Sequence, residues 1–229
     1  MPIAPNTELW RRLWGVASLR RWNPRLPPAN TASMILMLKK GELTMRIKLA
    51  RILAELREDH RNLTRLLDLL ENECRDVPEE GEPDMDLLHD IMHYMTVYPD
   101  AIHHPREDLV YTALREHCAD LAGGLESVPG DHREIAELGD TLRMDVEAII
   151  SGAAVTRQHL LEDLVNYVGH LRRHMEWEEA ELFPRADSLA SEKETATIDV
   201  SAHLGDDPVF GATTAKSFTN LLANLQRVQ

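Results

Sequence analysis

The chain has 229 residues, enough for one well-buried domain, and its formal net charge of -14 disfavours binding to a phosphate backbone. No stripe of Lys and Arg interleaved with aromatic residues offsets this charge, so we expect no nucleic-acid partner. Hydrophobic residues make up 43% and aromatic residues 5% of the chain. This composition favours helices over strands rich in aromatic and β-branched residues, and the sequence predicts an all-α fold.

Cysteine usage and hydropathy indicate the compartment. Cys74 and Cys118 are isolated thiols, without a CxxC pair or the density of a disulfide scaffold, which is typical of a reducing environment. The apolar runs are far shorter than the roughly 18 to 20 residues of a membrane span. We therefore expect a cytoplasmic protein that does not enter a membrane.

Residues 1–44 are expected to lie outside the folded domain. A signal peptide fits poorly, because Lys39 and Lys40 follow the short apolar stretch where a small-residue cleavage site belongs. A purine-rich stretch can encode residues 39–42, two codons before Met45, as in a bacterial ribosome-binding site. We interpret residues 1–44 as a disordered extension or a start-site artefact.

Hydrophobic periodicity predicts four long helices. Apolar residues recur at steps of three and four over residues 47–73, and a second helix begins at residue 85. Pro99 and Pro105 are expected to kink this helix or divide it in two, with the second part ending near Cys118.

The third helix is expected to begin at Asp131, its predicted N-cap, and to stop at residues 151–152. The fourth spans residues 156–183, where Pro184 is expected to end it. Short turns between long helices favour an up-down four-helix bundle over residues 45–185. Residues 186–229 are expected to form a C-terminal helical tail, with a turn at 205–208 and a weakly amphipathic helix at 215–225.

An internal duplication marks the chemistry. Asp-His-Arg occurs at residues 59–61 and 131–133, and HxxxE occurs at 103–107 and 174–178. The second histidine of each kind follows the first by 72 and 71 residues, respectively. Each half of the bundle then supplies two imidazoles and one carboxylate.

The spacing suits a pair of metal ions. Residues four apart share a helix face about 6 Å along the axis, and a bidentate Glu can bridge two metals roughly 3.5 to 4 Å apart. Two six-coordinate ions that share four histidines, two bridging carboxylates and an oxo or hydroxo bridge keep about two coordination positions open. Mixed imidazole and carboxylate ligands favour iron over manganese, and over the tetrahedral sites of structural zinc. The predicted ligands are His60, His103, Glu107, His132, His174 and Glu178.

The segments HHPREDLVY and HMEWEEAELFP and the two Asp-His-Arg openings resemble the motifs of bacterial hemerythrin-like HHE cation-binding domain proteins, over about residues 45–185. The Asp-Asp-Pro-Val-Phe-Gly stretch of the tail also resembles C-terminal extensions in some of them. The resemblance implies a hemerythrin-type bundle with a non-haem Fe–O–Fe or Fe–OH–Fe centre. It carries over the same six residues as ligands.

One position departs from oxygen-carrying hemerythrins. Their third helix has a second ligating His four residues after the first, whereas Ala136 stands four after His132. This departure disfavours simple reversible oxygen carriage. His170, one turn before His174, is expected either to replace the missing imidazole or to bond to a ligand from a second layer.

The remaining candidates have ordinary interpretations. His104 is expected to cap the helix or lie at the surface, with the alternative that it is the ligand in place of His103. His89 and His93 are expected to lie on a polar face, with the alternative that they bind metal. Asp108 and Glu179 are expected either to bond to groups around the ligands or to be solvated. Tyr111 and Trp177 are expected in or near the core. Three further histidines are expected to be solvated: His117, His159 and His203.

The leading functional hypothesis is a non-haem di-iron module that binds or senses dioxygen, nitric oxide or a related small ligand, or that buffers iron. The alternative is a di-iron redox enzyme acting on peroxide or dioxygen, with His170 or Tyr111 in proton or electron transfer. A third is a bundle with zinc or no metal that serves protein contacts. The sequence has no Walker, Rossmann or GxSxG motif, and it indicates no particular protein partner.

Overall fold

The computed structural model describes residues 34–39, 42–75, 83–193, 196–212 and 214–227. Helices dominate, which confirms the all-α prediction. The helices are α2 (Leu49–Arg75), α3 (Met85–Tyr98), α4 (His104–His117), α5 (Ala119–Ala122), α6 (Val128–Ile150), α7 (Arg157–Trp177), α8 (Phe183–Glu192) and α9 (Thr219–Arg227). The other elements are the π-helical segments η2 (Pro99–His103) and η3 (Glu178–Leu182), the 3₁₀ turn η4 (Lys216–Phe218), and the strands β1 (Met34–Lys39), β2 (Glu42–Lys48) and β3 (Thr197–Asp199).

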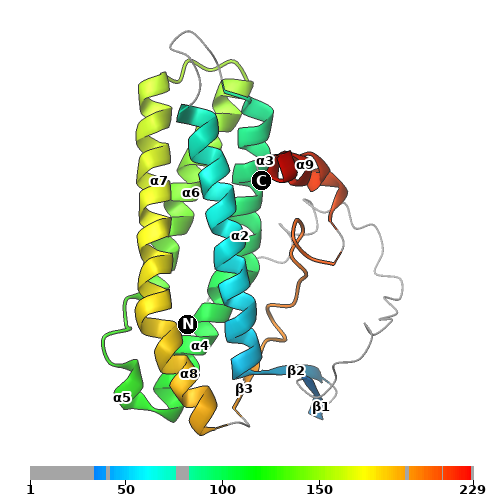
Figure 1. Cartoon of the computed structure of the whole chain (residues 1–229), viewed down its shortest axis with the longest axis vertical. Helices are drawn as coiled ribbons and strands as arrows, with labels where there is room; N and C mark the ends of the chain where they lie inside the picture. The colour runs from blue at the N-terminus through cyan, green and yellow to red at the C-terminus, as the bar shows by residue number, and fades with distance from the viewer. Residues whose placement is uncertain (1–33, 40–41, 76–82, 194–195, 213, 228–229) are drawn as a thin grey trace. The chain divides into compact units, whose positions relative to one another are not determined.

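Four helical columns pack side by side (Figure 1). The first is α2, the second runs through α3, η2 and α4, the third is α6, and the fourth runs through α7, η3 and α8. Helix α3 contacts α6, α6 contacts α7, and α2 contacts both α3 and α7. The columns that carry the repeated motifs are therefore neighbours. The up-down order of the bundle stays a prediction.

Two hydrophobic clusters occupy successive levels of the bundle. On α2, Leu56 belongs to one cluster and Leu63 to the other, and in the fourth column Leu182 and Met175 divide in the same way. His60 lies between Leu56 and Leu63 in the chain. A polar layer at this level is enclosed from both ends by apolar packing, which excludes water.

π-helical turns lie next to prolines where the sequence predicted a kink or an end. The N–H of His104 bonds to the carbonyl of Pro99, and the N–H of Phe183 bonds to that of Glu178, five residues back in each case. Pro184 lies in the first turn of α8, where a missing N–H is tolerated. The prediction that the fourth helix ends at residue 183 is wrong, since the column continues to Glu192.

Helix α6 begins earlier than predicted. Its first residue is Val128, preceded by Ser127, with a proline in the first turn. The assignment of Asp131 as N-cap is therefore wrong, because Asp131 already lies inside the helix. The predicted stop is confirmed: Ser151 caps the end, and Gly152 has φ +85°, a left-handed conformation that favours glycine.

Three short strands precede and follow the bundle. In an antiparallel sheet, β1 pairs with β2 and β2 with β3, and β2 leads directly into α2. Met45 lies within β2, and the predicted boundary between residues 185 and 186 falls within α8. Residues 1–33 lie outside the described residues, and the division into domains stays a prediction.

The C-terminal segment packs against the bundle. The predicted helix at 215–225 is confirmed as η4 and α9, and Phe218, Leu221 and Leu225 are buried in the cluster of Leu63. Asp207 accepts hydrogen bonds from the N–H groups of Val209 and Phe210, as in an Asx turn. Among the described residues, no helix combines the length and the apolar character that a membrane span requires.

Candidate metal centre

The six residues that the repeat selected all lie in the polar layer between the two hydrophobic clusters. His60 comes from α2, His103 and Glu107 from the second column, His132 from α6, and His174 and Glu178 from the fourth column. The two glutamates are 0% exposed, and none of the four histidines exceeds 6%. Such burial of polar groups is costly unless they are paired or bind a cation.

The first group of ligand atoms centres on Glu107. Its Oε1 lies 3.1 Å from the Nε2 of His60 and 3.1 Å from the Nε2 of His103. One ligand atom from each of these three residues lies within 4.8 Å of the others. An HxxxE pair and a histidine from a neighbouring helix therefore converge on one point.

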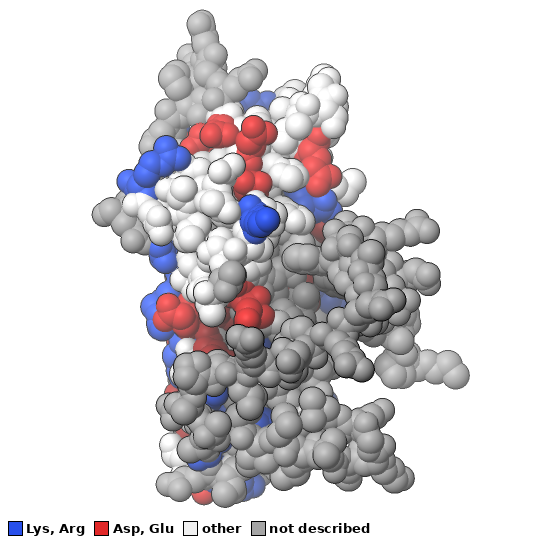
Figure 2. All heavy atoms as spheres, turned by 90° about the vertical axis from the view of Figure 1, so that its right-hand side faces the viewer, with Lys and Arg blue, Asp and Glu red and all other residues white. Residues whose placement is uncertain are grey.

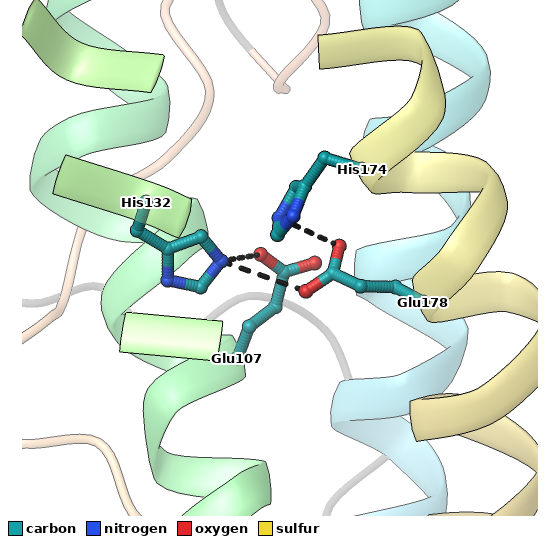
Figure 3. Close-up of side chains that lie close together, drawn as sticks. All are labelled: Glu107, His132, His174 and Glu178. Atoms are coloured by element: carbon teal, nitrogen blue, oxygen red, sulfur yellow. Dashed lines mark ion pairs between the residues drawn. The ribbon is translucent and has the colours of Figure 1, made fainter. Parts of the chain in front are cut away.

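The second group joins both halves of the repeat (Figure 3). The Nε2 of His132 lies 3.4 Å from Oε2 of Glu107 and 3.5 Å from Oε1 of Glu178, and the Nε2 of His174 lies 3.2 Å from Oε2 of Glu178. Glu178 Oε2 is also 3.5 Å from the Nε2 of His60. Each carboxylate thus faces imidazoles from both halves, the arrangement that a bridging ligand requires.

Carboxylates outside the layer orient three of the imidazoles. His103 donates from Nδ1 to Asp59 at 3.1 Å, and His60 donates from Nδ1 to Glu179 at 3.0 Å. His132 donates from Nδ1 to Asp108 at 3.0 Å. A proton held on Nδ1 leaves the Nε2 lone pair directed inward, as in metal sites with a carboxylate behind each histidine.

Glu179 and Asp108 thus bond to candidate ligands themselves, although their side chains are 40% and 41% exposed. Asp59 was not assigned a role from the sequence, although it opens the first Asp-His-Arg motif. The hydroxyl of Tyr98 donates to both carboxylate oxygens of Asp59, at 3.2 and 3.3 Å. A buried chain of polar groups thus runs from Tyr98 through Asp59 to His103.

Several inward atoms have no hydrogen-bond partner. They include Oε2 of Glu107, both carboxylate oxygens of Glu178, and the Nε2 atoms of His132 and His174. Each buried unpaired polar atom costs about 1 to 3 kcal/mol. Because these atoms face a common space and combine imidazole with carboxylate, a divalent or trivalent first-row metal fits the site.

Electrostatics show that the layer favours positive charge. Burial lowers the pKa of the imidazoles, but hydrogen bonds to the carboxylates outweigh it and raise the pKa of His60 to about 11. The same balance raises the pKa of His132 to about 12, and for His103 burial is outweighed by the charge of Glu107 together with hydrogen bonds, which raise the pKa of His103 to about 9. Burial alone would raise the pKa of Glu107, but the neighbouring imidazoles outweigh burial and hold this pKa well below its usual range. Metal ions entering this layer therefore displace protons.

His104 is buried, so the expected surface role is wrong, while its backbone N–H caps η2. Its side chain is 4% exposed, and its ring stacks on that of His132 with centroids 4.6 Å apart. Nδ1 lies 3.2 Å from Asp100, whereas Nε2 is buried without a hydrogen-bond partner. Burial lowers the pKa of His104, which keeps this imidazole neutral beside the layer. The sequence signal was the adjacent pair of histidines at the end of a proline-rich turn.

Other candidates lie outside both groups. His170 is half-buried, and its Nε2 lies 3.8 Å from Glu134. Because it belongs to neither group of ligand atoms found among the described residues, it does not supply the missing imidazole. The rings of His89 and His93 stack on each other with centroids 6.1 Å apart. Tyr111 is buried among apolar residues, as expected.

His159 has a carboxylate on either side, which the sequence did not indicate. Its Nε2 lies 3.4 Å from Asp145 and 3.5 Å from Asp163, and its side chain is 55% exposed. This surface group is separate from the buried layer. It becomes relevant when bound metal is counted.

A helical bundle with a buried layer of imidazoles and carboxylates is typical of metal-binding helical proteins. The sequence matches the hemerythrin HHE cation binding domain over residues 51–204. The chain belongs to this family, which confirms the resemblance inferred from its motifs, and the domain is one that binds cations. Comparisons with curated proteins and with solved structures gave no significant match.

Proposed function

We propose that the buried layer binds two non-haem iron ions, with His60 and His103 on one ion and His132 and His174 on the other. Glu107 and Glu178 bridge them. The observation that carries this proposal is that each glutamate faces imidazoles from both halves of the duplication, at 3.1 to 3.5 Å. One cation cannot occupy both groups of ligand atoms, whereas a bridged pair uses all six residues.

Iron suits this ligand set better than the alternatives. Structural zinc prefers a closed tetrahedral site rich in thiolates, and manganese prefers more oxygen ligands than the layer offers. Four imidazoles and two bridging carboxylates leave some of about twelve coordination positions unfilled. We propose that the protein uses these positions to bind or sense dioxygen, nitric oxide or a related small ligand, or that it buffers iron. Bound iron would supply a Lewis-acidic and redox-active centre.

A di-iron redox enzyme acting on peroxide or dioxygen is the second candidate. The chain of polar groups from Tyr98 through Asp59 to His103 favours it, because a tyrosine hydroxyl connected to a ligand can take part in electron and proton transfer. Turnover separates the two functions. Consumption of many equivalents of peroxide per chain would favour the enzyme, whereas a single binding event would favour the sensor.

We further propose a cytoplasmic location without nucleic-acid or membrane partners. Cys74 and Cys118 are free thiols, as expected in a reducing compartment. On the face shown in Figure 2, acidic and basic side chains are interspersed over the described residues and do not form a continuous basic surface. Small diffusible molecules remain the proposed partners.

Metal analysis of single-histidine variants tests the ligand assignment. The wild type loaded anaerobically with ferrous iron should hold about two ions per chain and, once oxidised, absorb in the near ultraviolet, whereas zinc would be colourless. His103→Ala and His174→Ala should each sharply lower the iron content, because each removes one ligand of a shared centre. His117→Ala and His203→Ala are controls.

The exposed group around His159 needs its own control. His159→Ala removes the imidazole between Asp145 and Asp163, so iron held there should bind more weakly without a change in the buried layer. Equal iron content in the His103, His174 and His117 variants would refute the assignment. Loss confined to the His159 variant would place the metal at the surface.

A further inference from the structure

The carboxylates that bond to the outer nitrogens of the candidate ligand histidines follow the symmetry of the repeat, with one exception. Asp59, which precedes His60, bonds to His103, the histidine of the following HxxxE motif. By the same repeat, Asp131, which precedes His132, corresponds to Asp59, and its expected partner is His174. The structure shows no hydrogen bond between Asp131 and His174, so this imidazole lacks the carboxylate that covers each of the other three.

His174 lines a pocket between α6 and α7. The pocket has a volume of about 200 Å³ and is lined by Asp131, His170, Arg173, His174 and Trp177. The side chain of His174, which lines this pocket, is 3% exposed. The imidazole of His174 separates a molecule in this pocket from the candidate metal centre.

The pocket lining carries one guanidinium and one carboxylate. Arg173 is exposed and makes no ion pair with any described residue, and the Nε2 of His170 lies 3.8 Å from Glu134. A guanidinium without a carboxylate partner attracts small anions and raises their local concentration. Asp131 is the one acidic side chain in the lining, and its charge opposes anion entry.

A larger pocket reaches the layer from another side but meets a covered imidazole. It has a volume of about 810 Å³ between α2 and the fourth column, and His60 lines it. There Glu179 bonds to Nδ1 of His60 at 3.0 Å and lies 3.4 Å from Arg57, so the Nδ1 side of this imidazole is covered by a carboxylate. Its Arg172 is neutralised by Asp68 and Glu71, at 2.7 and 2.6 Å.

We propose that the pocket between α6 and α7 is the entry site through which small anions reach the metal centre, with Arg173 as the residue that attracts them and Asp131 as the residue that opposes them. The inference rests on the proposed iron site. It adds a direction of approach and two charged residues, outside the six candidate ligands, that control the entry of anions.

Azide binding to the iron-loaded, oxidised protein tests the entry site. Azide bound to ferric iron creates a charge-transfer band, so stopped-flow absorbance gives its association rate. Arg173→Gln should lower this rate at low salt by about three- to ten-fold, and Asp131→Asn should raise it, since charges near an entrance steer ligands. High salt should reduce the difference between Arg173→Gln and the wild type. Association of nitric oxide, which is neutral, should be unchanged.

Arg172→Gln is the matched control, because it removes the same charge from the adjacent residue of α7 but faces the other pocket. Iron content is measured first in every variant. Equal azide rates in Arg172→Gln and Arg173→Gln, or a loaded wild type indifferent to azide, would overturn the entry site and leave iron binding intact. A wild type that holds no iron would overturn the proposed function and this inference together.

Discussion

Glu107→Gln should abolish the stabilisation of the fold by metal. Glu107 is 0% exposed, and its two oxygens face His60, His103 and His132 at 3.1, 3.1 and 3.4 Å. Glutamine keeps the size of the side chain but removes its charge and replaces one ligating oxygen with an amide that cannot ligate. Both proposed ions lose a ligand in a single substitution, which no change at one histidine achieves.

The magnitude follows from linkage. Free metal at 100 times its dissociation constant stabilises the native state by about 2.7 kcal/mol per site, so two sites contribute about 5.4 kcal/mol. For a chain of this length, 1 kcal/mol shifts the melting temperature by about 2 to 4 °C. Ferrous iron should therefore raise the melting temperature of the wild type by roughly 10 to 20 °C. In Glu107→Gln this shift should nearly vanish.

Circular dichroism melts with and without ferrous iron, under anaerobic conditions, measure the shift directly. Comparing each variant with its own metal-free form separates metal binding from any change in intrinsic stability. Glu116→Gln, at an exposed position of the same helix, is the control and should keep the full shift. A metal-induced shift in Glu107→Gln as large as that of the wild type would refute the bridging role.

Further predictions concern the surroundings of the layer. Tyr98→Phe removes the hydroxyl that holds Asp59 behind His103 and should weaken iron binding by about 10-fold or more, measured by chelator competition; unchanged affinity would contradict this role. Because the metal-free chain raises the pKa of His103 to about 9 and that of His60 to about 11, protons compete with metal, so iron affinity should rise from pH 6 to 8. The stability that these imidazolium groups give the metal-free chain is full below their unfolded pKa of about 6.5 and should be lost as pH rises through 9 to 11, which melts at each pH measure. A chain that starts at Met45 should fold and bind iron like the full chain; loss of its cooperative melting would show that residues before Met45 support the fold.

The sequence predicted the helices and the composition of the buried layer because both depend on short-range spacing. Leucines at steps of three and four define the buried face of α2, and the HxxxE spacing places His103 and Glu107 on one helix face. The duplication then identifies His174 and Glu178 as their counterparts. These inferences need only the helical period, which a chain of this composition follows closely.

Helix ends and the surroundings of the layer were harder to predict, because they depend on π-helical turns. Proline ordinarily ends or kinks a helix, so Pro184 was expected to stop the fourth column. A turn with hydrogen bonds five residues back precedes α8 and lets the column continue, which places Phe183 against the ring of His60 with centroids 5.1 Å apart. A similar turn ends at His103 and brings His104 against His132, and no helical periodicity announces such a turn.

The departures from symmetry lie around the layer more than within it. Duplication gives each half the same two imidazoles and one carboxylate, but Asp59 bonds to its histidine whereas Asp131 faces a pocket. His104 has no counterpart either, since Met175 stands at the matching position of the second half. A symmetric centre in a symmetric shell would present two equivalent sides to a ligand. Among the described residues, His174 has no carboxylate partner at its outer nitrogen, and it lies beside Arg173. The two proposed iron positions are therefore chemically distinct, and we expect small anions to approach the one held by His174.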